Sequence, residues 1–161
     1  MPIAVGDKIP DVEVRVMGAG GAPEAIRTIH VLGGGRVVLF AVPGAFTPGC
    51  SKTHLPGYVK QAEELTAKGV DRIVCVAVND AWVMDAWAKS QGAEGKILML
   101  ADGSGEFTRA MGLELDGSGF GLGSRSQRYA AVIEDGTITQ LHVEPAPGIT
   151  VSSCENVLAE L

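Results

Sequence analysis

The residue of this chain with the clearest chemical potential is Cys50, which ends the string PGAFTPGC over residues 43–50. An apolar run before this string predicts a buried strand, and the string SKTHL after it predicts a helix. Thr47 and Pro48 are typical of a helix start, because a hydroxyl caps the first turn and a proline needs no N–H partner there. A sulfur in that turn meets free backbone N–H groups and the positive end of the helix dipole, which favour the reactive thiolate. Cys50 is therefore a candidate nucleophile.

The surroundings of Cys50 favour a functional thiol over a structural one. A free cysteine is more commonly a small buried apolar residue than a nucleophile. Here, however, its neighbours are Gly, Thr and Pro and form no apolar stripe. A disulfide exchanger of the thioredoxin type is opposed, because threonine stands at both 47 and 53 and no Cys-x-x-Cys motif includes Cys50.

The spacing of Pro43, Thr47 and Cys50, a Pro-x-x-x-Thr-x-x-Cys pattern, resembles the active site of the peroxiredoxins. The longer string PGAFTPGCSKTHLPGYV is similar to the type-5 (type II) members in particular. The likeness continues through GVDRIVCVAVNDAWVMDAW and KILMLADGSGEFTRAMGLELD, so it covers almost the whole chain. The resemblance implies a thioredoxin-like fold, a thiol-dependent peroxidase and a homodimer. It also implies a dimer interface near Trp82 and Trp87, although core packing explains these two residues equally well.

A thiol peroxidase needs fixed donors beside its sulfur, because negative charge develops on two oxygens when a thiolate attacks a peroxide. Thr47 is the nearest candidate donor, although its hydroxyl also fits a plain helix cap. Pro43 has no donor, and its expected role is to shape the loop and shield the sulfur; an ordinary turn proline is the alternative. A nearby cation is expected as well, and arginine suits that place because it stays charged and donates in a fixed fork.

Sequence spacing selects none of the arginines, which stand at positions 15, 27, 36, 72, 109, 125 and 128. The resemblance does select one. The string SQRYA over residues 126–130 is similar to the strand that carries the active-site arginine of type-5 enzymes, at Arg128. Arg125, three residues earlier in the same basic turn, is the alternative. The predicted catalytic residues are Cys50, Thr47, Arg128 and Pro43.

Three other thiol or imidazole groups stay outside this predicted site. His54 follows Cys50 by one helical turn on the same face, where an imidazolium would favour the thiolate. A helix-surface histidine with a structural hydrogen bond is nevertheless the favoured interpretation. Cys75 lies in the apolar run IVCVAV and is expected in the core of a central strand. Cys154 begins an apolar stripe at helical spacing, which favours packing.

The carboxyl end departs from the family pattern at one place. Animal type-5 enzymes carry a resolving cysteine directly after a Gly-x-Thr, whereas Gly148-Ile149-Thr150 is followed here by Val151. Cys154 stands three residues late, which argues against an internal disulfide of the animal type. The sequence therefore predicts a one-cysteine mechanism, in which an external thiol reduces the oxidised Cys50.

The predicted activity is the reduction of hydrogen peroxide and organic hydroperoxides through a Cys50 sulfenic acid. Glutathione with glutaredoxin is the expected reductant; the alternative is thioredoxin, acting on an internal disulfide to Cys154 or Cys75. A redox-regulated binding or sensor protein is an alternative from another class. No cofactor or metal is expected, since the cysteines and histidines lack paired short spacing and the glycines of 117–123 match no phosphate loop.

Composition and charge narrow the class of protein. A chain of 161 residues is long enough for one domain, 1–161, and its hydrophobic fraction of 46% is typical of a globular protein. A net charge of −6 without a basic cluster argues against nucleic acid or an anionic membrane as partner. The first twenty residues show no secretory signal and no apolar stretch approaches a membrane span, so the cytoplasm is the expected location.

Strand and helix patterns alternate along most of the chain. Strands are expected over 36–42, 72–78 and 96–101, and helices over 50–68, 80–90 and 104–111. Asp80 is expected to cap the second of these helices, and Pro56 to kink the first. Two later apolar runs, 129–133 and 138–143, are joined by Asp135-Gly136, a strong hairpin signal.

The remaining segments of the chain have weaker patterns. An irregular or hairpin segment is expected over 2–17, then a glycine-rich turn and a short helix over 28–32. Residues 113–123 are expected to form a glycine-rich loop, and Ser152 with Glu155 matches the capping box of a last helix. This order predicts an α/β fold of the thioredoxin-like type, with a mixed central sheet flanked by helices.

Overall fold

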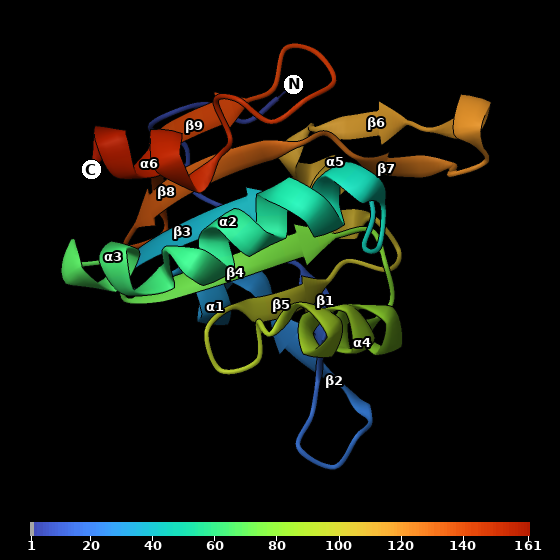
Figure 1. Cartoon of the computed structure of the whole chain (residues 1–161). Coiled ribbons are helices and arrows are strands. Elements are labelled where there is room, and N and C mark those ends of the chain that lie inside the picture. Colours follow the sequence, from blue (N-terminus) through green and yellow to red (C-terminus); the bar gives the residue numbers. More distant parts are fainter. Residues whose placement is uncertain (1) are drawn as a thin grey trace.

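The structure is a computed structural model that describes residues 2–161 (Figure 1); Met1, at the edge of the predicted domain 1–161, lies outside the described residues. The strands are β1 (Glu13–Met17), β2 (Pro23–Arg27), β3 (Arg36–Ala41), β4 (Arg72–Ala77), β5 (Leu98–Ala101), β6 (Glu114–Asp116), β7 (Ser124–Ser126), β8 (Tyr129–Glu134) and β9 (Thr137–Val143). The helices are α1 (Thr28–Leu32), α2 (Leu55–Lys60), α3 (Ala62–Ala67), α4 (Ala81–Gln91), α5 (Glu106–Met111) and α6 (Cys154–Glu160). A π-helical segment, η1 (Cys50–His54), precedes α2, and a short 3₁₀ turn, η2 (Ser118–Phe120), follows β6.

Within residues 2–161, seven strands form a mixed sheet in the order β2-β1-β5-β4-β3-β8-β9, while β6 and β7 pair separately and extend away from it (Figure 1). The central strands β3, β4 and β5 are parallel, and β8 pairs with β3 in the antiparallel sense. This is the predicted α/β fold with a mixed central sheet.

Both faces of the sheet are covered, which is why β3 and β4 read as nearly continuous apolar runs. On β3, Val38 and Phe40 belong to a core cluster with residues of α2, α3, α4 and α6. Val37 and Leu39 point to the other face, where they pack with residues of α1 and α5. The helices therefore flank the sheet on both sides, as the alternation of patterns predicted.

The helix after β3 differs from the expected single helix over 50–68 kinked at Pro56. Helical structure begins at Pro48, and the backbone N–H of Leu55 donates to the Cys50 carbonyl in a wide π turn. A proline ring collides with the carbonyl four residues earlier in an ordinary helix, and this wider turn lies directly before Pro56. The break falls instead at Gln61, between α2 and α3.

Three predictions at the edges of the fold are wrong. The segment over 2–17, expected to be irregular or a hairpin, is irregular only as far as β1, and the hairpin of β1 with β2 spans the glycine-rich turn instead of preceding it. Residues 113–123 are not all loop, because exposed β6 pairs with β7 there. The cap of the last helix is Ser153, which accepts from the Asn156 N–H, and not Ser152. Ser152 bonds to Glu144 instead, a long-range partner that a local motif cannot show.

Two local predictions are confirmed. Asp80 caps α4 by accepting a hydrogen bond from the Val83 N–H. The hairpin of β8 and β9 turns at Asp135 and Gly136, whose φ angles of 50° and 84° are both positive, as a type I′ turn requires. Within residues 2–161, the helices are all too short or too polar to cross a membrane.

Candidate active site

Cys50 and two of its predicted partners meet in space. The Thr47 Oγ1 lies 2.9 Å from the Cys50 Sγ, and the Arg128 Nη2 lies 3.2 Å from it. The sulfur sits in the first turn of the helix that begins at Pro48, and Cys50 is 0% exposed. A buried sulfur with a guanidinium and a hydroxyl donor is an environment in which an anion is stabilised.

The register of the sheet explains how Arg128 reaches a residue so far away in sequence. Strands β3 and β8 are antiparallel neighbours, and Ala41 at the end of β3 pairs with Tyr129 at the start of β8. Arg128 therefore enters β8 at the same edge at which the chain leaves β3 toward Cys50. The predicted choice of Arg128 over Arg125 agrees with this geometry.

The Thr47 hydroxyl has two acceptors within reach. Its Oγ1 lies 2.6 Å from the Gly44 carbonyl oxygen as well as 2.9 Å from the Cys50 Sγ. A hydroxyl has one hydrogen, so it donates to only one of them at a time. With a thiol at Cys50, the S–H donates to Thr47 while the hydroxyl donates to Gly44; with a thiolate, the hydroxyl is free to turn toward the sulfur.

His54 binds the second terminal nitrogen of the Arg128 guanidinium, the one that does not contact the sulfur. The Arg128 Nη1 donates to the His54 Nδ1 at 2.9 Å, because a guanidinium has only donors. The His54 Nε2–H then donates to the Ser152 carbonyl at 2.9 Å. Burial lowers the pKa of His54 to about 4, so the ring is neutral near pH 7 and keeps this tautomer.

The prediction of a surface position for His54 is wrong, since only 1% of the residue is exposed, although the expected structural hydrogen bond exists. Its role beside Arg128 was missed. The only sequence signal was its place one helical turn after Cys50, which brings both to the same side of the helix. That spacing does not show which residue of another element contacts the His54 ring.

Pro43 and Arg125 form the rim of the site. Pro43 is half-buried, and its carbonyl lies 3.5 Å from the Arg125 Nη1. The Arg125 Nε donates to the Leu122 carbonyl at 3.0 Å. Arg125 thus connects the turn before β7 with the loop that leads to Cys50. Within the described residues, the hydrogen bonds to the sulfur come from Thr47 and Arg128.

The loop between β3 and Cys50 is held in an unusual conformation. Phe46 has a φ of 66°, a region that bulky residues rarely adopt. The Ala45 N–H donates to the Asn79 Oδ1 at 2.9 Å, which ties the loop to the chain just beyond the end of β4. Asn79 was not singled out in the sequence, and its only signal there was its place directly after a predicted strand.

Two glycines lie close to the predicted site residues Thr47 and Arg128. A Cβ at Gly44 would lie 3.2 Å from the Thr47 Cγ2, and one at Gly49 would lie 3.4 Å from the Arg128 Nη2. In the residue after Cys50, the Ser51 Oγ accepts from the Trp87 Nε1–H at 2.9 Å. The buried Trp87 therefore anchors the turn that carries Cys50.

The other two cysteines are buried, as predicted. Cys75 lies within β4 and Cys154 begins α6, and both belong to the same core cluster as Cys50. Burial raises the pKa of the Cys75 thiol well above its ordinary value. Burial also raises the pKa of Cys154, to about 12. Both are protonated near pH 7 and are weak nucleophiles in this state.

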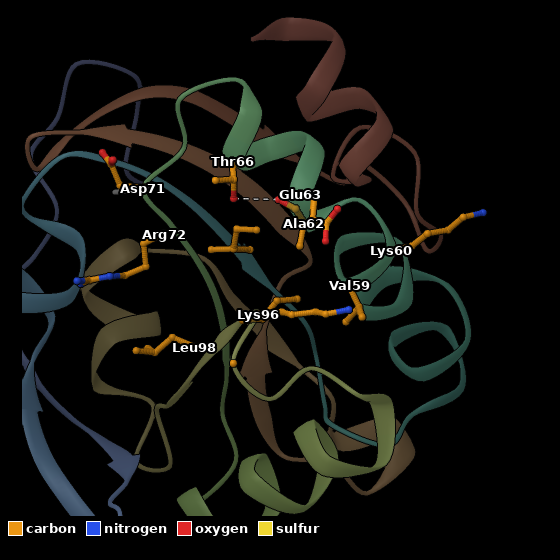
Figure 2. A pocket seen from close by; sticks show the side chains of 12 residues that line it. Val59, Lys60, Ala62, Glu63, Thr66, Asp71, Arg72, Lys96 and Leu98 are labelled. Atoms are coloured by element: carbon orange, nitrogen blue, oxygen red, sulfur yellow. Dashed lines mark hydrogen bonds between the residues drawn. The ribbon is translucent and has the colours of Figure 1, made fainter.

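A cavity of about 840 Å³, whose lining residues Figure 2 shows, is separate from the predicted site, because none of Cys50, Thr47 and Arg128 lines it. Its lining includes Lys60, Glu63, Asp71, Arg72 and Lys96. It opens where β4 and β5 begin, whereas Cys50 follows the carboxyl end of the parallel strand β3. Arg72 already donates to the Val31 carbonyl at 2.7 Å. Among residues 2–161, no three His, Cys, Asp or Glu side chains gather in a way that could hold a metal ion.

Comparisons with known proteins agree with this arrangement. The model of the Redoxin family matches residues 4–158. Peroxiredoxin-2E-2, chloroplastic, of Oryza sativa subsp. japonica is 48% identical over 163 residues, covering 99% of this chain and 72% of that protein. Peroxiredoxin-2B of Arabidopsis thaliana is 44% identical over 160 residues and is covered over 99% of both chains.

A solved structure has the same fold. The reduced Prx3 of Vibrio vulnificus in complex with H2O2 superimposes with a TM-score of 0.93 at 50% identity, over 98% of each chain. The sequence, the fold and the contacts of Cys50 thus indicate the same family. The chain belongs to the Redoxin family and, within it, to the type-5 (type II) peroxiredoxins, which are thiol-dependent peroxidases of the thioredoxin-like superfamily.

Proposed function

We propose that this peroxidase reduces hydrogen peroxide and organic hydroperoxides at Cys50, with Thr47 and Arg128 as the other catalytic groups and Pro43 shaping the loop. The observation that carries the proposal is the convergence of two donors on one buried sulfur, from Thr47 at 2.9 Å and from Arg128 at 3.2 Å. The solved relative from Vibrio vulnificus was crystallised with H2O2, which supports a peroxide as substrate.

The chemical step follows from these contacts. The Cys50 thiolate attacks one peroxide oxygen, so an S–O bond forms while the O–O bond breaks. The electron pair of the broken bond goes to the departing oxygen, which takes up a proton and leaves as water or an alcohol. Arg128 and Thr47 are placed to donate to the oxygens as charge develops on them. Cys50 is left as a sulfenic acid.

The proposed return to the thiol uses one cysteine of the chain. Cys75 and Cys154 share a core cluster with Cys50, so proximity alone does not exclude an internal disulfide. Their ionisation opposes it, because burial raises the pKa of both thiols and the thiolate is the species that attacks an oxidised sulfur. An external thiol is therefore the better nucleophile.

Glutathione with glutaredoxin is the proposed reductant. A first thiol attacks the sulfenic sulfur and releases water, which leaves a mixed disulfide on Cys50. A second thiol attacks that disulfide and releases the Cys50 thiol. Because Cys50 is fully buried, the turn that carries it must move before a tripeptide reaches the sulfur. We propose the cytoplasm as the location, because a reducing compartment supplies glutathione as the reductant.

A homodimer is proposed on the family resemblance and on two exposed aromatic residues. Trp82 is 62% exposed and Phe46 is 53% exposed. They lie on two segments that the hydrogen bond between Ala45 and Asn79 joins. Sedimentation of the reduced protein tests this part, and a monomer at micromolar concentration contradicts it.

Steady-state peroxidase assays test the proposed cycle. The wild type and the variants Cys50→Ser, Cys75→Ser and Cys154→Ser are assayed with hydrogen peroxide and with either glutathione and glutaredoxin or thioredoxin. Only Cys50→Ser should be inactive, and glutathione should support turnover of the other two. Turnover with thioredoxin alone that disappears in Cys75→Ser or Cys154→Ser would instead indicate an internal disulfide. A single round of oxidation without turnover would indicate a sensor.

A further inference from the structure

The carboxylate of Glu144 binds two residues of the segment that follows β9, Thr150 and Ser152. Its Oε2 accepts from the Thr150 N–H at 2.8 Å, the Ser152 N–H at 2.8 Å and the Ser152 hydroxyl at 2.6 Å. Its Oε1 accepts from the Thr150 hydroxyl at 2.7 Å. Burial by itself would raise the pKa of Glu144, but these hydrogen bonds from Ser152 and Thr150 lower it to about 2. The group is therefore charged at neutral pH and fixes Ser152.

The Ser152 carbonyl is the next member of the chain of contacts. It accepts from the His54 Nε2–H at 2.9 Å and from the Tyr58 hydroxyl at 2.8 Å. Both donors are buried. The His54 ring lies against Phe40 and Tyr58, with centroid distances of 5.1 Å and 5.6 Å. Packing and the shared carbonyl together fix the orientation of the imidazole.

Arg128 is held at both of its ends by this assembly. At one end, the Glu144 backbone N–H donates to the Arg128 carbonyl at 3.0 Å. At the other, His54 accepts from the Arg128 Nη1 at 2.9 Å, which leaves Nη2 on the Cys50 sulfur at 3.2 Å. The side chain of an arginine is long and flexible, so a donor aimed at a reacting atom needs such support.

We propose that Glu144 is a positioning residue for Arg128, acting through the Ser152 carbonyl and the His54 imidazole although its carboxylate contacts neither Arg128 nor Cys50. This inference rests on the proposed role of Arg128 at Cys50. According to this inference, the segment after β9 contributes to the reaction with peroxide as well as to the stability of the fold. A preorganised donor needs no reorganisation during the reaction, which is the gain that Glu144 supplies.

The first test compares Glu144→Ala with Glu144→Gln. A glutamine keeps the contacts, because its oxygen accepts the three bonds at Oε2 and its NH₂ donates to the Thr150 hydroxyl, which can rotate. The measurement is the second-order rate constant of the reduced enzyme with hydrogen peroxide. Glu144→Ala should lower it on the order of tenfold, while Glu144→Gln should stay within about twofold of the wild type. Equal rate constants in the alanine variant and the wild type would overturn the inference.

A matched control separates positioning from general loosening of the segment. Asn156 lies in the same region, where its Nδ2 donates to the Val151 carbonyl at 2.7 Å and its N–H is capped by Ser153. Asn156→Ala should lower the melting temperature as Glu144→Ala does and leave the peroxide rate constant unchanged. If both variants lose rate in proportion to stability, the role of Glu144 is structural and the inference is wrong.

Two further measurements follow the proposed path through Arg128 and His54. Adding Glu144→Ala to Arg128→Ala should cause no additional loss of rate, because the residue that Glu144 positions is already gone; a full additional loss would overturn the inference. Nitrogen NMR of the histidine rings should show His54 protonated at Nε2 in the wild type and a mixture of tautomers in Glu144→Ala. If Arg128→Ala keeps the wild-type rate, it is the proposed function that fails.

Discussion

The Arg128 guanidinium lies 3.2 Å from the Cys50 sulfur, although 78 positions separate the two residues in the chain. Two antiparallel strands, β3 and β8, bring them together at one edge of the sheet. Arg125 stands near the same site but contacts the Pro43 carbonyl. This difference between two arginines three positions apart, one in β7 and one directly before β8, leads to the first prediction.

Arg128→Ala should lower the rate constant for hydrogen peroxide by about a hundredfold while the protein stays folded, as removal of one preorganised donor typically does. Arg125→Ala is the matched control and should lose far less. Stopped-flow oxidation of the reduced protein measures both, with circular dichroism to confirm folding. A collapse of the rate in Arg125→Ala together with a near-normal Arg128→Ala would show that the wrong arginine is assigned.

The Thr47 hydroxyl should matter as a donor and not as bulk. Thr47→Val keeps the shape and removes the hydroxyl that lies 2.9 Å from the sulfur, so the peroxide rate constant should fall by about tenfold to a hundredfold. Thr47→Ser keeps the hydroxyl and should retain most of the rate. A serine variant as slow as the valine variant would show that packing of the threonine methyl, and not its hydrogen bond, is what counts.

His54 should make the fold sensitive to mild acid. Its pKa is about 4 in the folded state against 6.5 ordinarily, chiefly because of burial. As pH falls from 6.5 to 4, the unfolded chain takes up a proton that the folded protein does not, so the free energy of unfolding decreases, by about 3 kcal/mol at pH 4. His54→Gln has no such proton to bind and should show a flatter profile. Urea denaturation of both proteins at pH 7.5 and 4.5 measures the difference, and parallel profiles would contradict the assignment.

Glu144 titrates in a separate and lower pH window. Its pKa is about 2 in the folded protein against 4.5 ordinarily, because the hydrogen bonds from Ser152 and Thr150 outweigh the effect of burial. A carboxylate with a lowered pKa stabilises the fold above pH 4.5, and this stabilisation is lost as pH falls toward 2. Glu144→Gln should therefore change the dependence of stability on pH below 4.5 only. A change between pH 5 and 7 would point to another group.

Oxidation with one equivalent of hydrogen peroxide should give a sulfenic acid on Cys50 and no internal disulfide. The reason is the protonated state of Cys75 and Cys154, whose pKa values burial raises. Peptide mass mapping after trapping with a sulfenic-acid reagent makes the measurement. A dominant disulfide from Cys50 to either residue would refute the one-cysteine mechanism and leave the peroxidase assignment intact.

The strained backbone at Phe46 should show in a pair of substitutions. Glycine adopts its φ of 66° without the steric cost that a residue with a Cβ carries. Phe46→Gly should therefore be as stable as Phe46→Ala or more so, by up to about 1 kcal/mol, although glycine usually destabilises a chain. Thermal unfolding of the two variants compares them directly. A markedly less stable glycine variant would show that the loop does not hold this conformation in solution.

The sequence was most informative where the chemistry is local. Pro43, Thr47 and Cys50 lie in one loop and one helical turn, so their spacing along the chain already predicts their neighbourhood in space. The alternation of apolar runs and helical patterns predicted the α/β class for the same reason. Local patterns were misleading where a long-range partner competes, as at Ser152, which bonds to Glu144 and leaves the helix cap to Ser153.

The tertiary structure decided what surrounds the sulfur. The choice of Arg128 rests on the register of β3 and β8, and sequence reasoning could make it only through a family resemblance. The burial of His54 and its link through Ser152 to Glu144 depend on how the segment after β9 packs against α2. Spacing in sequence reports which residues share a face of one helix or strand, because backbone geometry repeats over a few residues. Which other helix or strand packs against that face, and with which of its residues, depends on the packing of the whole chain.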